Sequence, residues 1–440
     1  MADQDSSKVK LGVPSASRRR FLQGSAALVG SAAIMGAMPQ VTWASRGTGL
    51  ETTAAKLGFI ALTDAAPLFV ALEKGFFAKH GMSRVEVLKQ SSWGTTRDNL
   101  VLGSARNGID GAHILTPMPY LMSTGTVTNN QPVPINILAR LNVAGQCISV
   151  GREYQDLKVG LDATEFGAAV AAKRAGGAAV NAAMTFPGGT HDLWIRYWMA
   201  AAGINPDRDI NTIVVPPAQM VANMRVGSMD TFCVCEPWNE QLINQGIGYT
   251  ANTTGELWHN HPEKAFALRE DYVQTNPNAA RALTMAIMEA QIYCEQPENI
   301  EEVATICSRR RWINAPYADI INRMKGTFDY GTGRVVENHP DRMRYWEDHA
   351  SYPFQSHDLW FLTENMRWGT LPTSLDTGSL IARVNREDIW REAATKLGVD
   401  SKDIPESTSR GKETFFDGKV FDPENPMAYL DSLAIKRSVA

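Results

Sequence analysis

Short strand-like runs and longer helical runs alternate along most of this chain, and that alternation constrains its fold more than any other feature. Residues 65–80 are typical of the helical runs, because apolar residues recur at the spacing of one helix face and Gly81 follows. Residues 84–88 alternate apolar and polar side chains, as a strand does. Strands alternating with helices predict an α/β fold. This first set comprises strands at 56–61, 84–88, 111–115, 135–141 and 147–150 and helices at 65–80, 95–105 and 117–124.

A second set of alternating runs follows, and the chain becomes mainly helical after His261. The 440 residues are too many for one compact core. Two α/β lobes with a helical C-terminal part are typical of a binding protein that closes on a ligand in the cleft between its lobes. The expected boundaries are 45–155 for the first part of lobe 1, 156–258 for lobe 2, and 259–440 for the return to lobe 1 and the extra C-terminal helical segment.

Residues 1–44 have the order of a secretory signal: a basic segment, an apolar segment and a small-residue cleavage site. Arg18, Arg19 and Arg20 stand directly before Phe21-Leu22, which is typical of a twin-arginine signal. The apolar run is shorter than the roughly 20 residues of a spanning helix, and glycine and proline interrupt it. Because no cysteine lies near the predicted cleavage site, we expect a soluble periplasmic protein, with a retained signal acting as an anchor as the alternative.

The rest of the sequence contains none of the common catalytic or metal-binding signatures. His259-Asn260-His261 is better explained as a loop than as a metal site, and five cysteines, an odd number, favour free buried thiols. The formal net charge is −4, and removal of a signal with a charge of +3 leaves about −7. Such a chain is not expected to bind nucleic acid. We expect no enzyme activity, no cofactor and no metal.

Two turns rich in hydrogen-bond donors each join a predicted strand to a predicted helix, one turn in each lobe. The first is Ser91-Ser-Trp-Gly-Thr-Thr96, and the second is Pro187-Gly-Gly-Thr-His-Asp192. Backbone N–H groups at helix N-termini attract anions, and the indole of Trp93 and the imidazole of His191 add further donors. Each turn alone is explained as well by ordinary helix capping, but two such turns facing one cleft favour an anion site.

Several longer motifs resemble the nitrate- and bicarbonate-binding subunits of bacterial ABC importers, the NrtA/CmpA family. The resemblance covers about residues 55–435 and implies a two-lobed α/β periplasmic binding protein of the type II-like class. The motifs are Lys56-Leu-Gly-Phe-Ile-Ala-Leu-Thr-Asp-Ala-Ala-Pro67, Ser92-Trp-Gly-Thr-Thr-Arg-Asp-Asn-Leu-Val-Leu-Gly103, Asp110-Gly-Ala-His-Ile-Leu-Thr-Pro-Met-Pro-Tyr120, Met184-Thr-Phe-Pro-Gly-Gly-Thr-His-Asp192, Val214-Val-Pro-Pro-Ala-Gln-Met220, His261-Pro-Glu-Lys-Ala-Phe266, Asn385-Arg-Glu-Asp-Ile-Trp-Arg-Glu392 and Phe421-Asp-Pro-Glu-Asn-Pro426.

The resemblance implies a ligand site at the positions that match these motifs. At Cys235 this chain departs from the family, which more often has glycine there, so a side chain replaces a hydrogen. The implied ligand-binding residues are Trp93, Gln146, His191 and Lys264, with Gly188, Gly189, Thr190, Pro217, Cys235 and Glu236 around them.

The chemistry of these residues favours nitrate, and nitrite with it, as the ligand. Nitrate is a planar monoanion that accepts hydrogen bonds and donates none, so its site needs donors and a positive charge. Trp93, Gln146 and His191 can donate, and Lys264 adds a charge. Bicarbonate carries an O–H group that needs an acceptor, and the bicarbonate branch resembles a carboxylate-and-calcium arrangement.

The resemblance also implies partners: a membrane permease and its ATPase subunits, with the receptor acting as a monomer. Three alternatives stay open at this point. They are a bicarbonate receptor that uses calcium, an enzyme of the related fold used in thiamine-pyrimidine synthesis, and an exported redox protein. The export signal and the absence of catalytic or cofactor signatures count against the last two.

Overall fold

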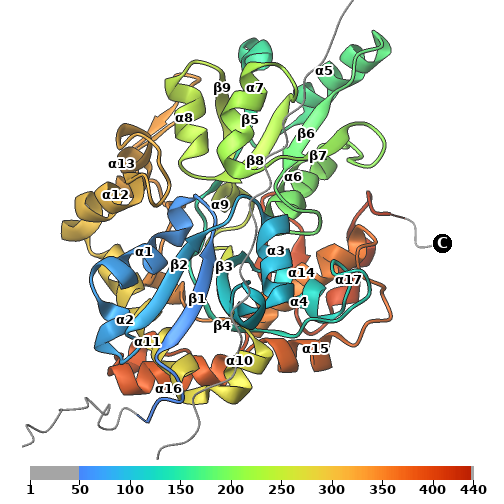
Figure 1. Ribbon diagram of the computed structural model, residues 1–440. Helices are drawn as coiled ribbons and strands as arrows, with labels where there is room; N and C mark the ends of the chain where they lie inside the picture. Colours follow the sequence, from blue (N-terminus) through green and yellow to red (C-terminus); the bar gives the residue numbers. More distant parts are fainter. Residues whose placement is uncertain (1–48, 438–440) are drawn as a thin grey trace, which may run out of the picture. The chain divides into compact units, whose positions relative to one another are not determined.

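The computed structural model describes residues 49–437 and contains two five-stranded sheets (Figure 1). The first sheet has the order β2-β1-β3-β10-β4. In it β1 runs parallel to β2 and β3, whereas β10 runs antiparallel to β3 and β4. Its strands are β1 (Ala54–Phe59), β2 (Arg84–Lys89), β3 (Gly111–Leu115), β4 (Ile135–Arg140) and β10 (Lys264–Arg269).

The second sheet repeats this arrangement in the order β7-β6-β8-β5-β9. Here β6 runs parallel to β7 and β8, and β5 runs antiparallel to β8 and β9. The antiparallel strand next to the edge is β10 in the first sheet and β5 in the second. The chain therefore crosses from the first sheet to the second before β5 and returns before β10. The strands are β5 (Gln146–Gly151), β6 (Asn181–Met184), β7 (Asn211–Val214), β8 (Thr231–Cys235) and β9 (Gly248–Thr253).

We call the first sheet with its helices the first lobe and the second sheet with its helices the second lobe. The prediction of a two-lobed α/β fold is confirmed. The strand at 147–150, grouped by the sequence with the first set, pairs with β8 and β9 in the second sheet. Because this strand lies before residue 155, the second lobe begins earlier than the boundary expected there. The boundary at 258 stays a prediction, and the predicted signal at 1–44 lies outside the described residues.

Helices cover the faces of both sheets, as expected for an α/β fold. In the first lobe α11 packs against α1, and α16 packs against α11. The helices up to residue 325 are α1 (Ala66–Glu73), α2 (Phe76–Lys79), α3 (Trp93–Leu102), α4 (Met118–Ser123), α5 (Thr164–Ala175), α6 (Thr190–Ala201), α7 (Met220–Arg225), α8 (Trp238–Asn244), α9 (Thr254–Leu257), α10 (Glu270–Thr275), α11 (Pro277–Glu295), α12 (Ile300–Ser308) and α13 (Ala318–Lys325).

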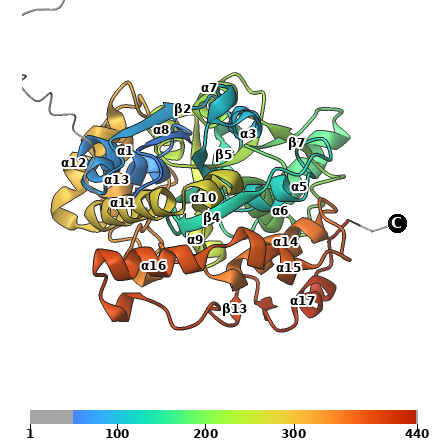
Figure 2. The same cartoon turned by 60° about the horizontal axis from the view of Figure 1, so that its bottom comes forward.

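The C-terminal segment contacts both lobes. Figure 2 shows α14 (Gln355–Arg367), α15 (Thr377–Val384), α16 (Glu387–Leu397) and α17 (Pro426–Ser432) along one side of the molecule. In the second lobe Trp194 stacks on Trp360, with ring centroids 5.0 Å apart. In the first lobe Arg140 of β4 pairs with Asp358, and both side chains are buried. The segment after Gly398 forms a short β13–β14 pair (Glu413–Thr414 and Val420–Phe421).

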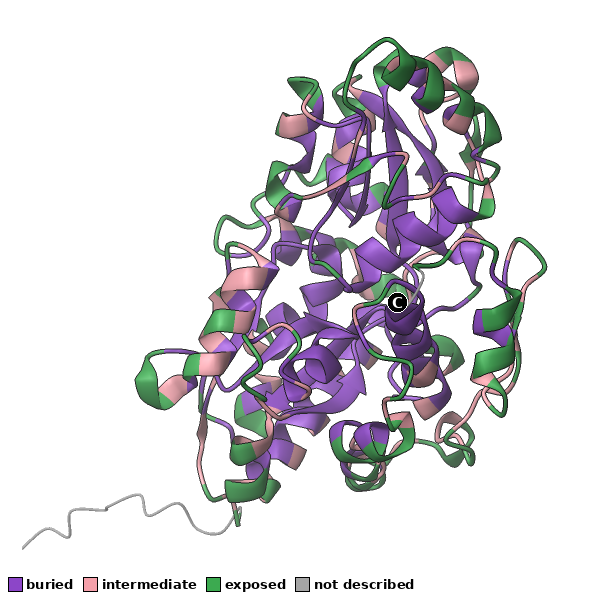
Figure 3. Ribbon diagram, turned by 90° about the vertical axis from the view of Figure 1, so that its right-hand side faces the viewer, coloured by how far each residue is buried: buried purple, intermediate pink, exposed green. Residues whose placement is uncertain are grey.

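The core follows the two sheets, whose central strands are buried in Figure 3. Outside this core, a short β11–β12 pair (Phe328–Asp329 and Val335–Val336) follows α13 in the sequence. Within residues 49–437, no helix combines the length and the apolar character needed to cross a membrane.

Candidate anion-binding site

Lys264, the first residue of β10, is completely buried. Its position is set by main-chain contacts, because the Lys264 carbonyl accepts from Leu141 N at 2.7 Å and Thr116 Oγ1 donates to the Glu263 carbonyl at 2.8 Å. The Lys264 ammonium lies 2.8 Å from Asp64 Oδ2 and donates to Glu263 Oε1 at 2.9 Å. Burial opposes the lysine charge, but the two carboxylates outweigh burial and raise the pKa of Lys264 above its ordinary value. The lysine is therefore a buried cation.

Residues of the second lobe surround this cation. His191, in the first turn of α6, places Nε2 3.4 Å from Lys264 Nζ and 3.2 Å from Gln146 Oε1. Its Nδ1 lies 2.6 Å from the hydroxyl of Thr185. Burial, and then the charge of Lys264, lower the pKa of His191 well below its ordinary value, so the imidazole is neutral at pH 7. The side chains of His191, Gln146 and Lys264, which the sequence assigned to one site, thus lie together.

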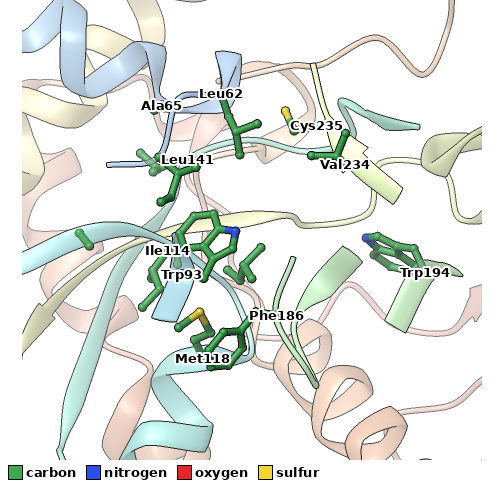
Figure 4. Packing of buried hydrophobic residues seen from close by; sticks show 14 of the residues in the cluster. Leu62, Ala65, Trp93, Ile114, Met118, Leu141, Phe186, Trp194, Val234 and Cys235 are labelled. Carbon is green, nitrogen blue, oxygen red and sulfur yellow. The ribbon is translucent and has the colours of Figure 1, made fainter. Parts of the chain in front are cut away.

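Trp93 supplies an unused donor from the first lobe. The helix α3 begins at Trp93, because the Ser92 hydroxyl caps it by accepting from Thr95 N at 3.1 Å; the sequence placed this start at Thr95. Within residues 49–437, the buried indole Nε1 of Trp93 has no hydrogen-bond partner. Lys264 Nζ lies 5.9 Å from the centre of the indole ring. In Figure 4 this nitrogen lies on the side of the ring toward Val234 and Cys235.

Two carboxylates at this site were missed from the sequence, which predicted donors and one positive charge. Asp64 Oδ1 lies 2.6 Å from His113 Nε2. Burial alone would raise the pKa of Asp64, but Lys264 and His113 outweigh it and lower that pKa well below its ordinary range. Glu263 accepts from the Thr190 hydroxyl through Oε1 and from Trp194 Nε1 at 2.8 Å through Oε2.

Both carboxylates stood next to residues that the sequence did single out. Asp64 lies inside the Thr63-Asp-Ala-Ala-Pro67 motif, and Glu263 directly precedes Lys264. Because a buried lysine needs a counter-charge, an acidic neighbour was the available signal.

The remaining predicted residues have different surroundings. Cys235 Sγ lies 3.8 Å from the Thr63 hydroxyl, and burial raises the pKa of its thiol well above the ordinary value. The Glu236 side chain points elsewhere, toward Cys147 and Arg323. Pro217 is buried at the start of a short 3-10 helix, Pro217–Gln219.

The turn before α6 uses its first two N–H groups internally. Gly188 N donates to Asp192 Oδ2 at 2.8 Å, and Gly189 N donates to the Phe186 carbonyl at 3.0 Å. A side chain on Gly189 would come within 2.6 Å of Leu115 in the first lobe, so this turn needs glycine for close approach. The expected free N–H groups at Gly188 and Gly189 are therefore not available in this structure.

Hydrogen bonds join the two lobes beside the site. The backbone N–H and the hydroxyl of Thr63 donate to the carbonyl of Glu236 at 2.9 and 3.1 Å. Trp238 Nε1 donates to the Ala61 carbonyl at 3.1 Å. Thr190 and Trp194 of the second lobe also donate to Glu263. The site is thus enclosed by groups from both lobes.

Comparison with known proteins places this fold and site in a family. A model of the NMT1-like family matches residues 48–308. The nitrate/nitrite binding protein NrtA of Synechocystis is 62% identical over 387 residues, which are 88% of this chain and 86% of that protein. The crystal structure of the periplasmic nitrate-binding protein NrtA from Synechocystis superposes with a TM-score of 0.86 and 62% identity, covering 88% of this chain and 100% of that one.

Two further relatives are named for other roles. The bicarbonate-binding protein CmpA of Synechococcus elongatus is 43% identical over 404 residues, covering 90% of each chain. The nitrate import ATP-binding protein NrtC of Synechocystis is 32% identical over 413 residues, which are 92% of this chain and 59% of that protein. The resemblance found in the sequence is confirmed: this chain belongs to the NMT1-like family and, within it, to the NrtA/CmpA family of substrate-binding proteins.

Proposed function

We propose that this chain is a periplasmic substrate-binding protein that captures nitrate, and nitrite with it, and delivers the anion to an ABC-type membrane importer. The observation that carries the proposal is the buried indole N–H of Trp93, which has no partner within residues 49–437 and lies beside the buried cation Lys264. A buried donor without a partner is costly, and an anion between the lobes would satisfy it.

The neighbouring groups support an anion that only accepts hydrogen bonds. Lys264 has three N–H donors, and Asp64 and Glu263 take up two directions around its ammonium. His191 Nε2 lies next to the same ammonium, and Gln146 lies next to His191. Nitrate needs only such donors, whereas bicarbonate would also need an acceptor for its O–H group. The nitrate/nitrite-binding relative is also more similar to this chain than the bicarbonate-binding one.

The proposal includes the cellular setting. The twin-arginine signal at 1–44 would direct the folded protein to the periplasm, where it would act as a monomer without enzyme activity. An ATP-binding relative named for nitrate import supports an ABC transporter as the partner. Ligand binding would stabilise the closed arrangement of the lobes, which the permease would recognise.

Titration calorimetry on the purified protein tests this function. We expect heat of binding with nitrate and nitrite, and its loss in Lys264→Glu. The matched control is Lys402→Glu, because the side chain of Lys402 is 74% exposed and lies outside the site. Heat with bicarbonate that depends on calcium, and none with nitrate, would establish the bicarbonate alternative instead.

A further inference from the structure

The buried ion cluster at this site carries more negative than positive charge. Lys264 faces both Asp64 and Glu263, and all three side chains are completely buried. Lys264 has a raised pKa and Asp64 a lowered one, so these two are charged at neutral pH. Glu263 accepts hydrogen bonds from three protein donors and is counted here as a carboxylate, although burial raises its pKa. With the neighbouring imidazoles neutral, the cluster has a formal charge of −1.

A nitrate ion would bring a second uncompensated negative charge into the same buried space. Charge buried without compensation is strongly unfavourable, and neighbouring groups then change protonation instead. A proton that enters with the anion would leave the total charge of the cluster unchanged. The cluster therefore needs a group that can accept one.

His191 is the group placed to take that proton. Its Nδ1 faces the Thr185 hydroxyl at 2.6 Å, and its Nε2 faces Gln146 Oε1 at 3.2 Å and Glu263 Oε1 at 3.7 Å. An imidazolium would thus meet an oxygen at each nitrogen, while its Nε2 would also face the Lys264 ammonium at 3.4 Å.

Several other charged or titratable groups surround His191 and affect its protonation. Lys264 opposes its protonation, whereas the negative charges of Asp64 and Glu263 favour it; His113 and His261 act as further neighbours. Burial lowers the pKa of His261 to about 3, so that ring is neutral and does not compete for the proton at neutral pH. His113 already faces Asp64 through Nε2, and its Nδ1 accepts from Ile60 N at 3.5 Å.

We infer that Asp64 and Glu263 set the charge selectivity of this site, so that it binds a singly charged anion together with one proton, which the imidazole of His191 holds. The inference rests on the proposed function, since nitrate is the anion considered. It adds that affinity depends on pH: an adjacent anion stabilises the imidazolium, so His191 has a higher pKa in the complex than in the free protein. Between those two pKa values, affinity rises as pH falls, by about tenfold per pH unit.

Nitrate calorimetry in buffers of low and high ionisation enthalpy, from about pH 5 to about pH 8, measures the protons taken up. We expect uptake that approaches one proton per nitrate within this range. Asp64→Asn, which removes one negative charge from the cluster, should reduce the uptake toward zero, and Glu263→Gln is a second variant of the same kind. Glu289→Gln is the matched control, because Glu289 lies 2.9 Å from His80 Nε2 in a histidine–carboxylate pair outside the site.

Nitrate binding with no proton uptake and constant affinity across this range would overturn the inference while leaving the proposed function intact. Uptake of one proton per nitrate in both Asp64→Asn and Glu263→Gln would also overturn it, because the two carboxylates would then not determine the number of protons bound. Absence of any nitrate heat would overturn the proposed function itself, and the inference with it. The wild-type proton count is decisive even if a variant fails to fold.

Discussion

The ammonium of Lys264 lies 2.8 Å from Oδ2 of Asp64, and both side chains are completely shielded from solvent. A buried ion pair is stable only while both partners are present, because each charge alone would remain desolvated. Here one lysine serves two carboxylates, so the lysine is the member whose loss matters most. The same cation that would attract an anion thus also holds the site together.

Lys264→Met should therefore lower the free energy of unfolding by about 3–5 kcal/mol at neutral pH, since it leaves buried carboxylates unpaired. Lys264 helps to lower the pKa of Asp64, so the pair stabilises the protein above the unfolded carboxyl pKa of about 3.9 and loses that contribution as pH falls. Urea unfolding at neutral and acidic pH measures both effects. Equal stability of wild type and variant at pH 7 would contradict the pairing.

Thr63→Val tests the hydrogen bonds between the lobes. The variant removes the hydroxyl that donates to the Glu236 carbonyl at 3.1 Å, while the backbone N–H of residue 63 keeps its own bond at 2.9 Å. One net hydrogen bond contributes about 0.5–1.5 kcal/mol, so nitrate should bind about 2- to 10-fold more weakly if only the closed form has this bond. Calorimetric affinities measure the change, and an unaltered affinity would show that the bond does not favour closure.

Glu413→Gln tests the attachment of the C-terminal segment. Glu413 accepts from Trp258 Nε1 at 2.9 Å and pairs with Arg410 at 2.6 Å. Burial would raise its pKa, but His357 and Arg410 outweigh burial and lower that pKa from 4.5 to about 2. The carboxylate therefore adds stability of roughly 3 kcal/mol above about pH 4.5, which is lost as pH falls toward about 2.

In urea unfolding, Glu413→Gln should be less stable than wild type at about pH 7, and the difference should shrink at about pH 3. Glu424→Gln provides the control, because Glu424 is exposed in the same C-terminal segment. A stability difference that stays constant with pH would show that the charge of Glu413 is not the source.

The sequence predicted the fold well where the pattern was local. The helical spacing at 65–80 predicted a helical region, which the structure divides into α1 and α2. The strand at 147–150 was found but assigned to the wrong set, because its partners β8 and β9 follow much later in the chain. The local pattern of apolar residues does not encode which distant strands pair with each other. Periodicity alone therefore could not reveal which sheet this strand joins.

The site, like the fold, could be predicted only in part from the sequence. Motif resemblance pointed to Gln146, His191 and Lys264, whose side chains the structure brings together. It did not reveal the counter-charges, because an isolated Asp64 or Glu263 looks like any surface carboxylate until burial is known. It also assigned Glu236 to the site, whereas only the fold shows that this side chain faces Arg323 and its carbonyl joins the lobes.

The most direct test of the central claim is nitrate calorimetry on wild type and Trp93→Phe. The indole N–H of Trp93 has no partner within residues 49–437, so its removal costs the free protein no hydrogen bond there. A hydrogen bond to a charged group contributes about 1.5–3 kcal/mol, so the variant should bind nitrate about 10- to 150-fold more weakly with little change in stability. Unchanged nitrate affinity in Trp93→Phe would contradict an anion site at this indole.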